Sequence, residues 1–313
     1  MGLLAQPMLV AAGAYSRLAP TERGGYHLAR FVRRFVAPDK WRGRFTTPDA
    51  FVLDLDLATY PDCCMAIGVY ERDTHRQLRK LLKRGSWFVD GGANIGYFST
   101  LAGHWVGKIG RVDAFEPDPQ NCERLRTNVD FNGVGQRVRV HNLALSDQSQ
   151  TLQMHRPSAE GTNHGMAGVH AQGEPFEAKA VRLDQFLSSE KRIPDVIKLD
   201  VEGSELIALR GMTRLLQAPQ PPVLVIEHNP ESCRAAGHLP SDLWRTLTDI
   251  RPAYRVYWIG WKLHRLSLPG QLDRITRVGN LLARVGDGLP EIPPPTRRPK
   301  ADRMATWWRN WME

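Results

Sequence analysis

The sequence predicts an α/β fold: a doubly wound, mostly parallel sheet with helices on both faces. Three observations between residues 85 and 268 predict it. Short apolar runs alternate with stretches of helical periodicity, a glycine-rich turn joins the first run to the first helix, and several runs end in an acidic residue. Repeated strand–helix units form parallel sheets, and their ligands bind at the carboxyl ends of the strands. We therefore expect the functional residues at that edge.

The elements follow in order along the chain. Strands are expected at 87–90, 112–116, 137–145, 195–200, 223–227, 254–259 and 264–268, the last two as a closing pair. The first helix is expected at 97–106. A second should begin at Asp118, a favourable N-cap, with Pro119 in the first helical position, and should end at Asn132-Gly133. Later helices are expected along Leu206, Leu209, Met212 and Leu216, and over 243–250 with Ser241 as the cap.

Charge and composition divide the 313-residue chain into three parts. We expect an N-terminal extension and cap over 1–67, the catalytic domain over 68–268, and a basic tail over 269–313 that is rich in Pro and Trp. Residues 1–85 carry a net charge of +6, residues 86–261 of −2 and residues 262–313 of +5. The basic flanks and the tail tryptophans leave a peripheral membrane contact open, whereas the acidic centre argues against nucleic acid as the substrate.

Other global features are those of an ordinary soluble globular protein. No apolar run is long enough to cross a bilayer, and the apolar start of the chain lacks the basic region of a signal peptide. The four cysteines, Cys63, Cys64, Cys122 and Cys233, fit neither a zinc site nor a disulfide framework. We therefore expect buried thiols in a cytoplasmic protein, without a metal site.

The turn after the first strand can be interpreted as either of two ligand-binding motifs. As Gly91-x-Ala93-x-x-Gly96 it is a degraded dinucleotide-binding fingerprint. As Asp90-x-Gly92-x-Asn94-x-Gly96 it is a loop that holds the amino-acid end of S-adenosylmethionine. In both readings the glycines allow a tight turn and a close approach of the backbone to a ligand at the start of a helix.

Further cofactor-binding residues are expected at the next two strand ends. Glu116 lies 20 residues after Gly96, where a carboxylate can bind both hydroxyls of a ribose. The segment Ala144 to Asp147 follows the third strand, where an adenine would lie against backbone. The complete expected set is Asp90, Gly92, Asn94, Gly96, Glu116, Pro117, Ala144 and Asp147.

Candidate catalytic residues end the two central strands. Asp200 and Glu202 follow the run 195–200, and Glu227 and His228 end the run 223–227. The expected sheet order brings these segments side by side, and we propose the four residues as the pool from which a base and its orienting groups come. His228 has the most suitable ordinary pKa, and Asp200 the most suitable position. Outside this pool, Tyr70-Glu71 could form a lid, and Asn163 and His164 a substrate loop.

Together these motifs resemble the FkbM family of methyltransferases. The resemblance runs from Gly68-Val69-Tyr70-Glu71 through FVDGGANIGYFS and AFEPDPQNCERLRTNVDFN to VIKLDVEGSELIALRGM and VLVIEHNP, about two thirds of the chain. It implies a class I methyltransferase fold with seven strands, the last antiparallel, and S-adenosylmethionine as the cofactor. It also implies O-methylation of a hydroxyl on a sugar, a polyketide or another small metabolite.

Three alternatives remain open at this point. An NAD-dependent dehydrogenase would use a similar sheet, but Asn94 and the DVEGSE segment argue against it. A nucleic-acid methyltransferase would use the basic flanks. A metal-assisted reaction, with Asp200, Glu227 and Asn229 as oxygen ligands, would suit Mg²⁺, although the resemblance implies no metal.

Overall fold

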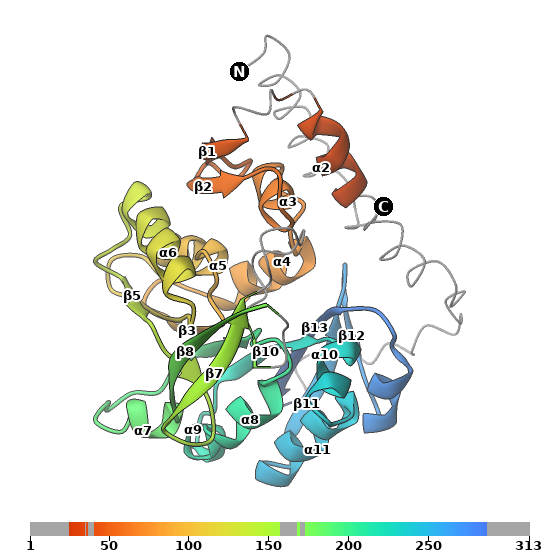
Figure 1. The fold of residues 1–313 in the computed structure, drawn as a ribbon. Coiled ribbons are helices and arrows are strands. Elements are labelled where there is room, and N and C mark those ends of the chain that lie inside the picture. Colours follow the sequence, from red (N-terminus) through yellow and green to blue (C-terminus); the bar gives the residue numbers. More distant parts are fainter. Residues whose placement is uncertain (1–24, 35, 37–40, 157–167, 170–172, 287–313) are drawn as a thin grey trace.

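The computed structural model describes residues 25–286, except 35, 37–40, 157–167 and 170–172, and consists of a large sheet between two layers of helices (Figure 1). The strands are β1 (Arg42–Thr46), β2 (Val52–Asp56), β3 (Trp87–Gly91), β4 (Arg111–Phe115), β5 (Val138–His141), β6 (Ala144–Leu145), β7 (Gln150–Arg156), β8 (Glu174–Val181), β9 (Val196–Leu199), β10 (Val223–His228), β11 (Tyr254–Ile259), β12 (Leu263–Arg265) and β13 (Gly279–Val285). The helices are α2 (Gly25–Arg33), α3 (Asp62–Ala66), α4 (Arg72–Leu81), α5 (Tyr97–Trp105), α6 (Pro119–Phe131), α7 (Leu183–Phe186), α8 (Glu205–Arg210), α9 (Thr213–Gln217), α10 (Pro230–Ala235), α11 (Pro240–Ile250) and the 3₁₀-helix η2 (Pro269–Arg274).

The large sheet has the order β12-β11-β13-β10-β9-β3-β4-β5. Strands β10, β9, β3, β4 and β5 are parallel neighbours, and β13 runs antiparallel to both β10 and β11. The sheet therefore contains seven strands of which only β13 is reversed, and the short β12 extends it as a hairpin partner of β11. This arrangement confirms the predicted class I methyltransferase fold.

Local signals in the sequence correspond to several element ends. Asp118 caps α6 by accepting a hydrogen bond from the Gln120 N–H at 2.9 Å, as its position before Pro119 predicts. The expected strand over 137–145 divides into β5 and β6, and β6 pairs with β8 in a separate three-stranded sheet. Ser241 does not cap α11, because that helix already begins at Pro240, and the Asp242 carboxylate accepts the Leu239 N–H instead.

Strand β13 was not predicted, and it lies beyond residue 268, where the catalytic domain was expected to end. Its centre is buried between β10 and β11, with Leu281, Leu282 and Ala283 almost inaccessible to solvent. The apolar run of β13 is short, and the segment before it contains glycine and several charged residues. The sequence pattern in this region is therefore typical of a loop. The sheet is complete only when this strand is included.

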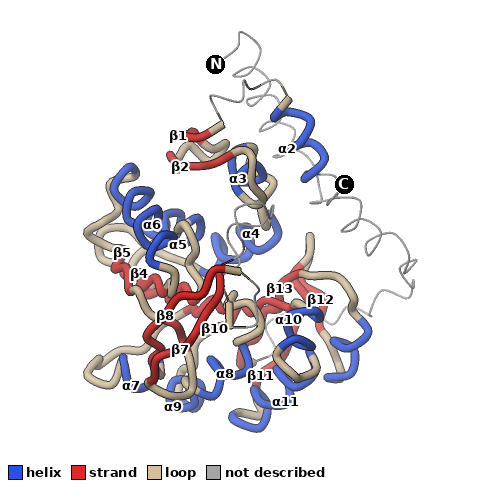
Figure 2. The backbone as a smooth tube through the Cα atoms, in the orientation of Figure 1, coloured by secondary structure: helices blue, strands red, loops and turns tan. Residues whose placement is uncertain are grey.

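Each face of the sheet carries its own hydrophobic core. On one face, Leu78 of α4, Leu101 of α5 and Leu125 of α6 pack in a single cluster with β3 and β4 residues. On the other face, α8, α9 and α11 contribute the second cluster, which includes Leu209 and Leu216. Figure 2 shows these two groups of helices on opposite sides of the strands. The helical periodicity of the sequence correctly predicted the buried residues Leu206, Leu209, Met212 and Leu216, but the one helix expected along them is divided into α8 and α9 at residues 211–212.

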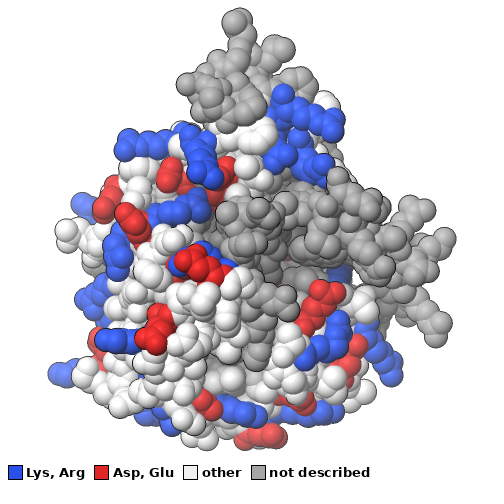
Figure 3. Space-filling model, in the orientation of Figure 1, with Lys and Arg blue, Asp and Glu red and all other residues white. Residues whose placement is uncertain are grey.

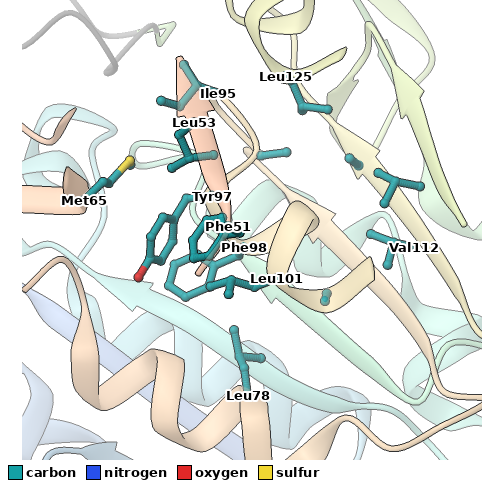
Figure 4. Packing of buried hydrophobic residues seen from close by; sticks show 14 of the residues in the cluster. Phe51, Leu53, Met65, Leu78, Ile95, Tyr97, Phe98, Leu101, Val112 and Leu125 are labelled. Atoms are coloured by element: carbon teal, nitrogen blue, oxygen red, sulfur yellow. The ribbon is translucent and has the colours of Figure 1, made fainter. Parts of the chain in front are cut away.

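The segment before the catalytic domain packs directly on the first of these cores. Phe51, Leu53 and Met65 share a buried cluster with Tyr97 and Phe98 of α5, as Figure 4 shows. Strand β2 is also fixed to α6 by two asparagine side chains. Asn128 Oδ1 accepts the Asp54 N–H at 2.7 Å, and Asn132 Oδ1 accepts the Val52 N–H at 2.9 Å. The described part of the N-terminal extension is therefore continuous with the body of the domain.

Surface charge follows the uneven distribution in the sequence. In the view of Figure 3, Lys and Arg side chains gather over α2 and the neighbouring N-terminal strands. All four cysteines are buried free thiols. Within the described part of the chain, no helix is long and apolar enough to cross a membrane. The expected substrate-loop residues Asn163 and His164, and the tail tryptophans, lie outside the described residues.

Candidate active site

The loop between β3 and α5 is shaped by two glycines in the left-handed region. Gly92 has φ +75°, and a Cβ atom there would lie 1.8 Å from the carbonyl oxygen of Asp200. Gly96 has φ +85°, and a Cβ atom there would lie 2.8 Å from the Leu125 side chain. Only glycine fits at either position, because any side chain would be strained and would collide with neighbouring atoms. The loop is therefore held tightly against the end of β9.

Asp90 closes β3 beneath this loop. Its carboxylate is almost fully buried; Oδ2 accepts a 2.6 Å hydrogen bond from Ser99 Oγ, and Oδ1 has no partner among the described residues. Burial raises the pKa of Asp90, and the nearby ammonium of Lys198 partly counteracts it. An unpaired buried oxygen costs free energy, so it indicates a site at which a ligand or water supplies the missing donor.

Glu116 lies at the end of β4 and contacts the same loop. Its Oε2 accepts the Asn94 N–H at 2.8 Å, and its Oε1 accepts the Asp118 N–H at 3.0 Å. Burial raises the pKa of Glu116 to about 7. Asn94 itself has φ +51°, and its side-chain oxygen accepts the Ile95 N–H. The structure thus brings together two residues that the sequence predicted for the same cofactor.

The remaining predicted cofactor residues lie at or just beyond the ends of β4 and β6. Pro117 is half-buried, and its carbonyl accepts a hydrogen bond from Asn142. Ala144 is buried in β6, and the following Leu145 packs against Gly91, where a Cβ would lie 2.7 Å from Cδ1. Asp147 is half-exposed just beyond. The end of β6 therefore contacts the end of β3, from which the glycine loop starts.

Lys198 is a site residue that sequence reasoning missed. It is buried in β9, its Nζ lies 2.6 Å from Asp200 Oδ2, and it also lies 5.0 Å from the centre of the Phe98 ring. Burial alone would lower the pKa of Lys198, but Asp200, Glu71 and Asp90 together raise it. The available signal was a lysine within an apolar strand, two residues before Asp200 and so on the same face.

Three of the four predicted catalytic residues form an acidic cluster at the ends of β9 and β10. Leu199 pairs with Ile226, so Glu227 lies beside Asp200. Burial and then Asp200 raise the pKa of both Glu202 and Glu227 well above the usual range. Glu202 is half-buried with φ +53°, whereas Glu227 is buried.

Two further carboxylates and an amide surround this acidic cluster. Glu205 accepts the N–H groups of Val201 and Gly203, and burial raises its pKa to about 7. Glu71, in the segment before α4, accepts a 2.9 Å hydrogen bond from Asn280 Nδ2 on β13. The segment predicted as a lid therefore bonds through Glu71 to Asn280, which is the direct strand partner of Glu227.

His228 is not part of the acidic cluster. It follows Glu227 in β10 and therefore faces the opposite side of the sheet. There its ring packs edge-on against Trp258 at 5.5 Å, and Nε2 bonds the carbonyl oxygen of Ile275 at 3.1 Å. Burial lowers the pKa of His228. These contacts are those of a packing residue, and they place the imidazole away from the candidate bases.

The site fits an adenosyl donor that carries a positive charge. Gly92 and Gly96 allow backbone contact, and Glu116 offers carboxylate oxygens at a strand end. The acidic cluster lies at the ends of the neighbouring strands, where a bound cation favours the ionised form of its carboxyl groups. Among the described residues, no group of His, Cys, Asp and Glu side chains has the geometry to hold a metal ion. Fold and site together define a class I, S-adenosylmethionine-dependent methyltransferase.

The family match and two related sequences agree with this class. Residues 90–251 match the methyltransferase FkbM domain, and the chain belongs to this family. It is 30% identical over 182 residues to the hexuronic acid methyltransferase AglP of Haloferax volcanii, covering 58% of this chain and 69% of the relative. Methyltransferase 1 of Beauveria bassiana is 27% identical over 147 residues, with coverage of 41% and 58%. A solved O-methyltransferase from Thermotoga maritima has 14% identity and a TM-score of 0.39, covering 71% of this chain and 68% of that one.

Family membership separates two of the enzyme classes that the sequence left open, the methyltransferase and the dehydrogenase. The protein is a methyltransferase, and the NAD-dependent dehydrogenase alternative finds no support in these relatives. S-adenosylmethionine is the cofactor, as the resemblance implied. The acceptor that receives the methyl group is a separate question.

Proposed function

We propose that the protein methylates a hydroxyl oxygen of a sugar or a similar small metabolite. The observation that carries this proposal is the acidic cluster of Asp200, Glu202 and Glu227, which lies next to the glycine loop. The name of the Haloferax relative, a hexuronic acid methyltransferase, supports a sugar as the acceptor.

In this reaction the bound sulfonium donor supplies an activated methyl group. The protein has to place the acceptor oxygen in line with that group and remove the hydroxyl proton as the oxygen attacks. We assign the proton to Asp200, because its half-buried carboxylate ends β9 and is oriented by the 2.6 Å ion pair with Lys198. Asp90, Gly92 and Glu116 hold the donor.

Asp200→Asn tests this assignment. The amide keeps the size of the side chain but cannot accept the proton, so turnover should fall about 10²–10⁴-fold while donor affinity changes little. Asp249→Asn, an exposed position on α11, is the matched control and should retain full turnover. Unchanged turnover in Asp200→Asn would show that another group removes the proton.

The acceptor is tested with labelled donor and a panel of uronic acids, neutral hexoses and phenols. We expect label in a sugar ether that survives mild base. Label that mild base removes would show methylation of a carboxyl group, and label in phenols alone would exclude a sugar acceptor.

A further inference from the structure

Glu227 on β10 and Asn280 on β13 face each other on neighbouring strands. Each has one side-chain oxygen that accepts no hydrogen bond from the described residues. They are direct partners in the antiparallel pair β10–β13, and both are buried. Neither Glu227 Oε2 nor Asn280 Oδ1 has a hydrogen-bond partner among the described residues. Direct partners lie on the same face of a sheet, with Cβ atoms about 4.5–5.5 Å apart. Two buried acceptor oxygens therefore lie on one face of neighbouring strands, and no described residue donates a hydrogen bond to either.

The amide of Asn280 is oriented by a contact on its other side. Its Nδ2 donates to Glu71 Oε2 at 2.9 Å, so its Oδ1 is the atom left to accept a hydrogen bond. A proton on Glu227 would provide the missing donor and satisfy both orphaned oxygens at once.

The charges around Glu227 favour that proton. The groups that act on it most strongly are the carboxyls Asp200, Glu202, Glu205 and Glu71, from β9, from the loop and helix that follow it, and from the segment before α4. Strand β13 contributes the neutral amide of Asn280. The ammonium of Lys198 is bonded to Asp200. Burial and these carboxylates raise the pKa of Glu227 well above its ordinary value.

We propose that Glu227 is a carboxylic acid hydrogen-bonded to Asn280 in the free protein, and that it releases its proton when the positively charged methyl donor binds. This inference rests on the proposed function of the same site. The donor and its product differ by one positive charge, and a cation within about 4–6 Å lowers a carboxyl pKa by roughly 1–3 units. Glu227 would therefore distinguish the charged donor from the neutral product.

The experiment is calorimetric titration in phosphate and in Tris, whose ionisation enthalpies differ, between pH 6 and 8. The ligands are S-adenosylmethionine, S-adenosylhomocysteine and sinefungin, in which an amine cation replaces the sulfonium. We expect proton release with the two cationic ligands and none with the neutral product. Equal proton release with all three ligands would overturn the inference while leaving the proposed function intact. Absence of binding by all three would overturn both.

Glu227→Gln identifies the group. The glutamine amide can donate to Asn280 Oδ1 but cannot ionise, so we expect the donor-specific proton release to disappear. The preference for S-adenosylmethionine over S-adenosylhomocysteine should fall about tenfold, the equivalent of one pKa unit. Affinity for S-adenosylhomocysteine should not change. Glu123→Gln, an exposed glutamate on α6, is the matched control. Proton release that persists in Glu227→Gln would assign the proton to another acid and refute the proposal.

Discussion

Replacement of Lys198 by methionine tests the electrostatic balance of the site. Methionine has a similar length and suits an apolar core, but it leaves Asp200 without its partner. The side chains of Lys198 and Asp200 are 2% and 16% exposed, so water can only partly replace the lost ion pair. Because the charged partners raise the pKa of Lys198, its contribution is complete below its unfolded pKa of about 10 and is present at neutral pH.

The magnitude follows from the geometry of the pair. At 2.6 Å and an effective dielectric constant of about 20, the Coulomb attraction is about 6 kcal/mol. Desolvation of the ammonium cancels part of this, and removal of one partner of a buried pair costs roughly 3–5 kcal/mol. The residual exposure of Asp200 favours the lower end, so we expect Lys198→Met to lower the free energy of unfolding by about 3 kcal/mol.

Urea denaturation at pH 7.5 measures this loss as a lower midpoint with an unchanged slope. Lys179→Met, at an exposed position in β8, is the control and should change the unfolding free energy by less than about 0.5 kcal/mol. The double variant Lys198→Met/Asp200→Asn should recover part of the loss, because it removes the unpaired carboxylate. A single variant within about 1 kcal/mol of the parent protein would refute the reasoning.

Three further predictions use other parts of the site. Gly92→Ala should destabilise the protein more than Gly133→Ala in thermal denaturation, because both have positive φ but only Gly92 would clash with backbone; equal losses would show that the loop yields easily. His228→Gln should keep methyl transfer within a few-fold of the parent protein while lowering its melting temperature, and a large loss of turnover at normal stability would return the imidazole to the reaction. Because burial raises the pKa of Glu116 from 4.5 to about 7, the folded state binds a proton more tightly, so the unfolding free energy should fall as pH rises from about 4.5 to 7. Glu116→Gln should flatten that slope in denaturation curves recorded across this range, and an unchanged slope would assign the titration elsewhere.

The sequence predicted the parts of the fold that depend on local pattern. Strands β3, β4, β9 and β10 are apolar runs, and the glycine loop and the Asp118 cap have strong local signals. Strand β13 could not be found in this way, because its apolar run is short and follows a segment that contains glycine and several charged residues.

The same distinction applies to the site. Asp200, Glu202 and Glu227 were predicted from their positions at strand ends, and the structure brings them together. Successive side chains of β10 point to opposite faces of the sheet. His228 comes one residue after Glu227, and it therefore faces away from the acidic cluster. Lys198 lies two residues before Asp200, and a lysine within an apolar run is its one local signal; its proximity to Asp90 and Glu71, which are distant in the sequence, depends on the fold.

The position of β13 also governs when the domain can become complete during synthesis. Strands β10 and β11 cannot be joined until the ribosome has made residue 285, because the strand that lies between them is the last of the sheet. Until then β10 and β11 each have an edge with unpaired backbone N–H and C=O groups beside apolar side chains. Another chain can pair with such an edge, and this leads to aggregation. A nascent chain that pauses near residue 268 therefore carries two open edges, and a chaperone that shields them would act at this stage.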